Sequence, residues 1–148
     1  MARLIGVNHV ALEVGDLDAA LALLGRLFEL ELRGRVPGMA FIDMGDQFLA
    51  LSQGREQPPD ADRHFGLVVD DVEGVAAALE REGIAHTRSR SGSVRFQDPW
   101  GNNFEVVAYQ AVQFERAPGV RRKLGIEQLA KSESARREMA ERGLADGP

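Results

Sequence analysis

Two stretches of the chain alternate apolar with other residues, and each is followed by a stretch with helical spacing. The alternation covers residues 8–14 and 64–69. A period of two predicts β-strands with one face against a core. The helical spacing behind each strand predicts an amphipathic helix, from apolar residues at 17, 20, 21, 24, 27 and 28 and at 72, 75, 76 and 79.

Local signals support these elements. Asp16 and Asp71 stand where a helix N-cap belongs, and Gly83 stands where the second helix should end. Three short runs with strand-like composition follow each helix. They are residues 29–35, 39–44 and 47–52 in the first half and 84–90, 93–97 and 103–109 in the second. Each half therefore predicts the order βαβββ.

The two halves also match residue by residue at an offset of 55. Nine identities share this ungapped register: 9/64, 12/67, 14/69, 16/71, 22/77, 24/79, 26/81, 41/96 and 43/98. Such a match favours duplication of one module over a chance similarity between two amphipathic patterns. The sequence predicts an α+β fold of two tandem βαβββ modules in one structural domain. The divisions are a first module at 1–53, a linker at 54–63, a second module at 64–112 and a C-terminal helical tail at 113–148.

The tail lies outside the repeat. Residues 126–142 predict a charged helix with only Ile126, Leu129 and Met139 as larger apolar residues. So thin an apolar stripe is expected to lie across the body or a second subunit. The basic run at 121–123 is interpreted as a solvated face.

Composition narrows the function. Of 148 residues, 44% are hydrophobic and 28% charged, as in a globular protein, and the net charge of −5 argues against nucleic acid as a partner. With no cysteine, a metal would need histidine and carboxylate ligands. The N-terminal stretch predicts neither a signal peptide nor a spanning helix, so a cytoplasmic protein without membrane association is expected.

Three side chains with metal-ligating chemistry fall on matching strand faces. His9 and His64 occupy the same repeat position and point away from the apolar, helix-facing side of their strands. Glu105 has the same parity on the last strand of the second module. Two nitrogens and one oxygen suit Zn, Mn, Fe, Co or Ni and leave positions open. The alternative is that these histidines are satisfied by hydrogen bonds alone. His86 is expected at a loop or strand edge.

Three motifs resemble the vicinal oxygen chelate superfamily, which includes glyoxalase I, fosfomycin-resistance transferases, extradiol dioxygenases and bleomycin-resistance proteins. They are NHVALEVGDLDAAL (8–21), HFGLVVDDVEGVAAAL (64–79) and FQDPWGNNFEVV (96–107). The resemblance implies that the paired modules form a cup-shaped mixed sheet. It also implies one divalent metal ion per chain, held by His9, His64 and Glu105.

The sequence departs from glyoxalase I at a fourth ligand. The first-module counterpart of Glu105 is Leu49, or Ala50 if the strand slips by one, and neither can bind a metal. We therefore expect negligible glyoxalase I activity and a preference for chelating oxyanions, because one fewer anionic ligand leaves more positive charge on the metal.

Two further residues are candidates for catalysis. Arg95 is expected on the face of Glu105, where a guanidinium would suit an anionic oxygen; the alternative is that it pairs with Glu105. Glu13 shares the face of His9 and would serve as a general base or a partner of that histidine; otherwise it is a solvated carboxylate.

The leading hypothesis is a metal-dependent enzyme acting on a small molecule that chelates through two adjacent oxygens, by lyase, transferase or dioxygenase chemistry. The alternative is a non-catalytic protein that binds a small molecule or an antibiotic, as bleomycin-resistance proteins do. A homodimer is expected, because members of the superfamily commonly pair modules between chains.

Overall fold

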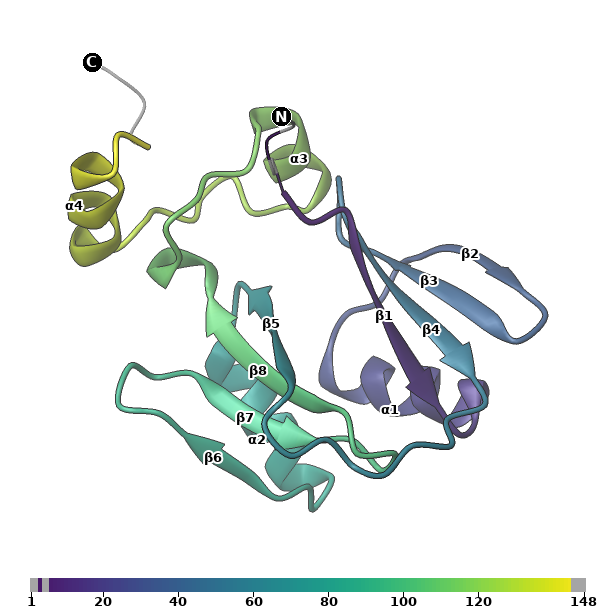
Figure 1. Cartoon of the computed structure of the whole chain (residues 1–148). Helices are drawn as coiled ribbons and strands as arrows, with labels where there is room; N and C mark the ends of the chain where they lie inside the picture. Colours follow the sequence, from purple (N-terminus) through teal and green to yellow (C-terminus); the bar gives the residue numbers. More distant parts are fainter. Residues whose placement is uncertain (1–2, 4–5, 145–148) are drawn as a thin grey trace. The chain divides into compact units, whose positions relative to one another are not determined.

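The computed structural model describes residue 3 and residues 6–144 of the chain. Two compact units are present: Met1–Pro59 with Pro99–Asn102, and Asp60–Asp98 with Asn103–Pro148. The change from the first to the second falls within the linker expected at 54–63. Each unit holds one βαβββ module, coloured purple to blue and teal to green in Figure 1.

The first module forms a mixed sheet of four strands. Its strands are β1 (His9–Val14), β2 (Leu32–Val36), β3 (Met39–Asp43) and β4 (Phe48–Gln53), and helix α1 is Leu17–Leu27. The strand order is β1-β4-β3-β2. The β1·β4 pair is parallel, and the other two pairs are antiparallel.

The second module repeats this topology. Its strands are β5 (His64–Val69), β6 (His86–Arg88), β7 (Val94–Gln97) and β8 (Asn103–Ala108), and helix α2 is Val72–Arg81. The order β5-β8-β7-β6, with β5 parallel to β8, matches the first module strand for strand. The predicted α+β fold with two tandem modules is confirmed.

Both helices begin as the sequence predicts. The Asp16 carboxylate accepts a hydrogen bond from the backbone N–H of Ala19 at 2.7 Å, and that of Asp71 accepts from Gly74 at 2.9 Å. Gly83 follows α2 with a φ of 66°, the left-handed conformation that glycine adopts most readily. Each helix buries one face, formed by Leu17, Ala20, Leu23, Leu24 and Leu27 in α1 and by Val72, Val75, Ala76, Ala78 and Leu79 in α2.

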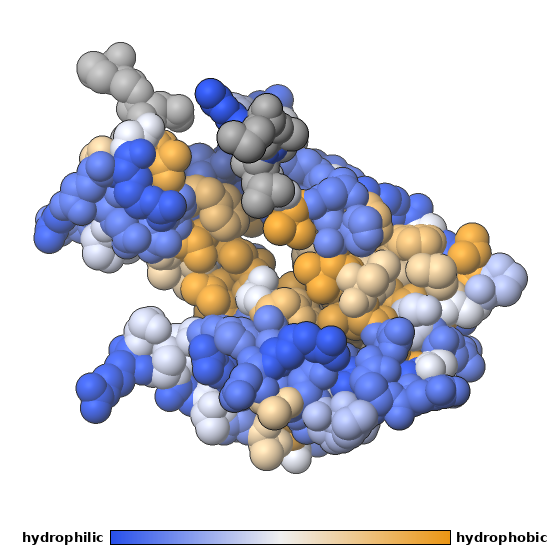
Figure 2. Space-filling model, in the orientation of Figure 1, coloured by the Kyte–Doolittle hydropathy of each residue, from blue (hydrophilic) through white to orange (hydrophobic). Residues whose placement is uncertain are grey.

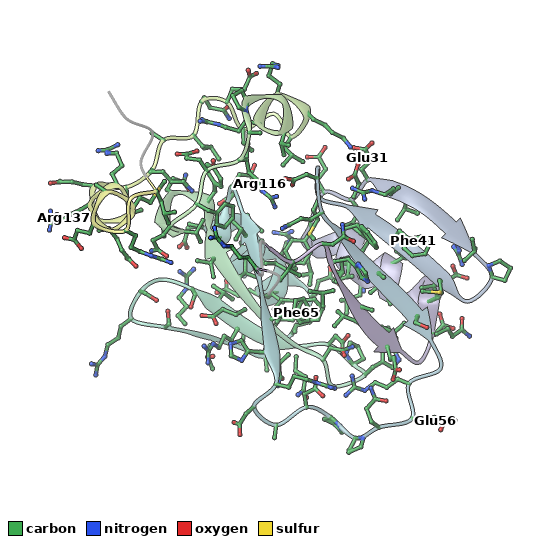
Figure 3. The ribbon with its side chains drawn as sticks, turned by 45° about the horizontal axis from the view of Figure 1, so that its top comes forward. Glu31, Phe41, Glu56, Phe65, Arg116 and Arg137 are labelled. Carbon is green, nitrogen blue, oxygen red and sulfur yellow. The ribbon has the colours of Figure 1, made fainter. Side chains whose placement is uncertain are left out.

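Aromatic packing forms the core of the second module. Phe104 of β8 is only 1% exposed. Its ring stacks on that of Phe96 with centroids 4.8 Å apart. It meets the ring of Phe65, which is labelled in Figure 3, edge-on at 4.6 Å. Because Phe104 and Val106 face this core, the alternation along β8 directs Glu105 to the other face.

The charged helix expected at 126–142 is present but shorter, as α4 (Glu133–Glu141). A 3₁₀ turn, η1 (Tyr109–Ala111), ends the second module, and the tail also holds a short helix, α3 (Pro118–Lys123). Gly125, with a φ of 66°, ends α3, and the Ser132 hydroxyl starts α4 by accepting from the N–H of Ala135 at 3.1 Å. Residues 126–132 lie outside any helix, so the expected helix begins only after the Ser132 cap.

The tail packs on the second module. α4 contacts η1, and Ala135 and Met139 are its buried residues. Hydrophilic side chains cover much of the outside of α4 (blue in Figure 2). Among the described residues, no helix combines the length and apolar composition needed to cross a bilayer.

Candidate metal centre

Strands β5 and β8 bring His64 and Glu105 together. In the parallel register, His64 pairs with Asn103 and Gly66 pairs with Glu105. The two side chains thus start on the same face of neighbouring strands, and Gly66 places no side chain between them. The distance from His64 Nε2 to Glu105 Oε2 is 3.5 Å, and the His64 side chain is 42% exposed.

A hydrogen bond sets the tautomer of His64. Its Nδ1 lies 3.0 Å from the backbone carbonyl oxygen of Asp62. A carbonyl only accepts, so Nδ1 carries the hydrogen, and Nε2 is the ring nitrogen that faces the Glu105 carboxylate. Metal-bound histidines are oriented by this kind of contact at their second nitrogen.

Two donors hold the Glu105 carboxylate. The Ser93 hydroxyl donates to Oε1 at 2.6 Å, and the Arg95 guanidinium donates to Oε2 at 2.8 Å. The Ser93 hydrogen bond is the main reason that the pKa of Glu105 is lowered, and Arg95 adds to it. The carboxylate is therefore ionised at neutral pH, as a metal ligand must be.

Ser93 is a hydrogen-bond partner of Glu105 that the sequence did not predict. It is 4% exposed and lies two residues before Arg95. That spacing was the available signal, because residues two apart in a strand share a face. The sequence left two roles open for Arg95, contact with an anionic oxygen or pairing with Glu105, and in this structure Arg95 pairs with Glu105.

The first module carries His9 and Glu13 on β1. The His9 ring stacks on Phe48, its partner in the β1·β4 register, with centroids 4.7 Å apart. Its Nδ1 is 2.8 Å from the Asn8 side-chain oxygen, which can only accept, so Nδ1 carries the hydrogen. Glu13 shares the face of His9, and its backbone carbonyl accepts from the Asn102 amide at 3.0 Å.

The structure thus groups His64, Glu105 and Arg95 within the second module, while His9 and Glu13 lie in the first. Among residue 3 and residues 6–144, no group of three or more His, Cys, Asp or Glu stands in a metal-binding arrangement. His86 lies on β6, at the edge of its sheet, as expected.

A family model matches residues 6–106, which include both modules almost entirely. The chain belongs to the Glyoxalase/Bleomycin resistance protein/Dioxygenase superfamily. The predicted family resemblance is confirmed. The tail beyond residue 106 lies outside the matched region.

Relatives in this superfamily have both transferase and lyase names. Over 110 residues the chain is 28% identical to the glutathione transferase FosA of Serratia marcescens, covering 68% of this chain and 78% of the relative. The lactoylglutathione lyase structure from Agrobacterium tumefaciens is 27% identical, with a TM-score of 0.57 over 72% of this chain and 96% of that one.

A FosX structure shares the fold and holds a metal. A mutant of FosX from Listeria monocytogenes, complexed with Mn(II) and 1S,2S-dihydroxypropylphosphonic acid, is 19% identical with a TM-score of 0.61. The alignment covers 70% of this chain and 90% of that one.

The strand register identifies the counterpart of Glu105 in the first module. Glu105 pairs with Gly66, and 55 residues earlier Ala50 pairs with Ala11. Ala50, rather than Leu49, is therefore the counterpart of Glu105, and its methyl group offers no ligand atom.

The strand register also changes the counterpart of Phe41, which the sequence repeat had matched with Phe96. Arg95 pairs with Glu105, and Phe41 pairs with Ala50. Phe41 is thus the structural counterpart of Arg95, although its sequence match is Phe96. The first module carries an aromatic ring where the second carries a guanidinium.

Proposed function

We propose that this protein is a divalent-metal-dependent enzyme of the vicinal oxygen chelate type, acting on a small substrate that chelates through two adjacent oxygens. The observation that carries the proposal is the approach of His64 Nε2 to Glu105 Oε2, at 3.5 Å on one sheet face. The bound ion would be Zn, Mn, Ni, Fe or Co, one per chain, with His9 as the third ligand.

The residues present suit such an ion. Both histidines engage Nδ1 with an oxygen acceptor and keep Nε2 for coordination. Glu105 is ionised, and one carboxylate with two imidazoles is a set that divalent first-row metals accept. Pairing of the two modules, within one chain or between two chains, would supply His9 to the other two ligands.

The chain's own residues then determine the substrate class. A bound ion would supply Lewis-acid polarisation of a substrate oxygen. Arg95 donates to Oε2, the oxygen nearest His64, so ligation through Oε2 would free its guanidinium for an anionic group. Ser93 would keep Oε1 in place, and Glu13 would accept a proton at its carboxylate or orient His9. We therefore propose an anionic substrate such as a phosphonate, a catecholate or a 2-oxo acid.

A second candidate function is small-molecule binding without catalysis. The observation that favours it is that both oxygens of Glu105 already have protein donors, Ser93 and Arg95. A carboxylate satisfied in this way needs no metal to remain ionised. The two functions differ in their requirement for metal.

Metal binding tests the proposal directly. Titration with Mn(II), followed by electron paramagnetic resonance, should give about one ion per chain for the wild type. His64→Ala should weaken binding at least about 100-fold, because it removes a ligand rather than a partner of one. His86→Ala is the matched control, since His86 also bonds a carbonyl through Nδ1 but lies on the edge strand.

The control should bind as the wild type does. Negligible binding of Mn(II), Zn(II), Ni(II) and Fe(II) by wild type and His64→Ala alike would exclude the metal-dependent enzyme and leave the binding protein. Equal, tight binding by both would remove His64 from the site.

We also propose a homodimer. Strand β2 is at the edge of the first sheet and exposes Leu32 and Val36, at 45% and 49%. An apolar sheet edge is a template for association. Light scattering at micromolar concentration should give twice the 16.2 kDa chain mass, and a monomer mass would contradict the prediction.

A further inference from the structure

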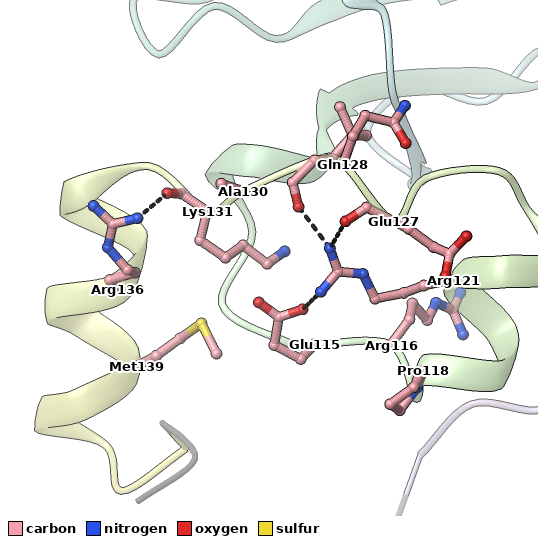
Figure 4. A pocket seen from close by; sticks show the side chains of 11 residues that line it. Glu115, Arg116, Pro118, Arg121, Glu127, Gln128, Ala130, Lys131, Arg136 and Met139 are labelled. Atoms are coloured by element: carbon pink, nitrogen blue, oxygen red, sulfur yellow. Dashed lines mark hydrogen bonds and ion pairs between the residues drawn. The ribbon is translucent and has the colours of Figure 1, made fainter. Parts of the chain in front are cut away.

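The tail forms an open pocket from its own residues, between Glu115 and Met139, apart from the residues proposed to bind metal. Its volume is about 670 Å³, within the range of about 300–1,000 Å³ that small-molecule sites occupy. Residues from the segment after η1, from α3, from α4 and from the loop between these helices line it (Figure 4). Nothing in the proposed metal chemistry uses this pocket.

A buried lysine is its most unusual lining residue. The chain has two lysines, Lys123 and Lys131, and Lys131 is only 5% exposed. Its ammonium donates to the carbonyl oxygen of Tyr109 at 2.6 Å and lies 3.5 Å from the centre of the Tyr109 ring. Burial lowers the pKa of Lys131, so the charged ammonium bears a desolvation cost that a nearby anion would offset.

The pocket holds more positive than negative charge. Four cationic and two anionic side chains line it, in a protein whose net charge is −5: Arg116, Arg121, Lys131 and Arg136 against Glu115 and Glu127. The Glu115 carboxylate has two partners. It accepts a hydrogen bond from the Tyr109 hydroxyl at 2.7 Å and lies 3.6 Å from Arg121 Nη1. The ammonium of Lys131 points toward this Glu115–Arg121 pair (Figure 4).

Arg121 is fixed and has an unused donor. Its Nη2 donates to the carbonyl oxygens of Glu127 and Leu129, at 2.7 and 2.8 Å. Its Nε is buried and is one of two buried side-chain polar atoms without a hydrogen-bond partner among the described residues. The predicted solvated face at 121–123 is therefore wrong for Arg121. A buried donor without an acceptor is destabilising, so Arg121, like Lys131, bears a desolvation cost in this cluster.

Of the remaining lining residues, Gln128 is polar and the other four are apolar. Pro118, Leu129, Ala130 and Met139 contribute to the wall. We propose that this pocket binds a small organic anion, a carboxylate with an apolar body, whose head lies between Lys131 and Arg121. The apolar body packs against Leu129 and Met139.

Calorimetry with octanoate as the probe tests this site. Wild type should bind octanoate, and octan-1-ol, which has the same chain length but no charge, should bind at least about tenfold more weakly, because charge-assisted hydrogen bonds are lost. Lys131→Met keeps the length of the side chain and should weaken octanoate binding by at least about tenfold. Lys123→Met, on the exposed surface of α3, should bind as the wild type does.

A second variant covers the case in which Lys131→Met unfolds the tail. Ala130 is exposed yet lines the pocket, so Ala130→Trp should fill the pocket and weaken octanoate binding while circular dichroism stays unchanged. No octanoate binding by the wild type at millimolar concentration would overturn the proposal. Equal binding of octanol and octanoate, or full binding by Ala130→Trp, would also overturn it.

Discussion

Phe104→Ala is expected to lower the free energy of unfolding by about 3–5 kcal/mol, the range for removing a buried phenylalanine. Phe104 is 1% exposed and contacts two other rings, Phe96 and Phe65. The loss combines the transfer of the ring from water with the cavity that it leaves among neighbours that cannot fully close around it. Urea unfolding followed by far-ultraviolet circular dichroism measures it.

Phe114→Ala is the matched control, because it deletes the same atoms from a side chain that is 39% exposed. Its ring meets Tyr109 edge-on at 6.4 Å, a looser contact than those of Phe104. Folding removes less of the Phe114 ring than of the Phe104 ring from water. The expected decrease in the free energy of unfolding is therefore below about 2 kcal/mol. Equal losses for the two variants would show that the aromatic cluster is not the centre of the second module's stability.

Gly101→Ala is expected to cost about 2–5 kcal/mol, because two unfavourable effects add. Gly101 has a φ of 89°, a conformation that alanine adopts only with strain. A Cβ there would also overlap the Cα and Cβ atoms of Pro59. Neither atom belongs to a flexible side-chain end, so the backbone would have to move. Fluorescence of Trp100, the chain's one tryptophan, would report the change at this turn during urea unfolding.

Gly92→Ala separates the two effects. Gly92 has the same φ of 89°, and a Cβ there would meet no atom within 4 Å. It should therefore show the conformational strain alone, about 1–2 kcal/mol. If the two variants lose equal stability, the close approach of Pro59 to Gly101 does not limit this turn.

The repeat made most of the fold predictable. Both N-caps, Asp16 and Asp71, and the facing directions of His64 and Glu105 followed from local spacing. Local spacing cannot predict which residues of two strands face each other when the loop that joins the strands varies in length. The sequence left Leu49 and Ala50 as alternatives because the loop before the last strand differs in length between modules, and the hydrogen-bonded register resolved them.

The tail and Ser93 were less predictable, for different reasons. The spacing of Ser93 from Arg95 indicates a shared strand face, but it does not identify the hydrogen-bond partner, Glu105, which lies 12 residues away on the neighbouring strand. In the tail, the carbonyls of Glu127 and Leu129 lie where a helix was expected. They accept hydrogen bonds from the Arg121 side chain instead of from a helical backbone. Side-chain to backbone bonds of this kind depend on the folded context.

The parallel pairing of β5 with β8 also bears on how the site forms during biosynthesis. His64 and Glu105 stand on the first and last strands of their module, so a ribosome must add 41 residues after His64 before its partner exists. Closing so long a loop has an entropic cost that only the completed sheet offsets. A nascent chain stopped anywhere before β8 therefore lacks the histidine–carboxylate pair altogether, and this pair appears only as the module reaches its native state.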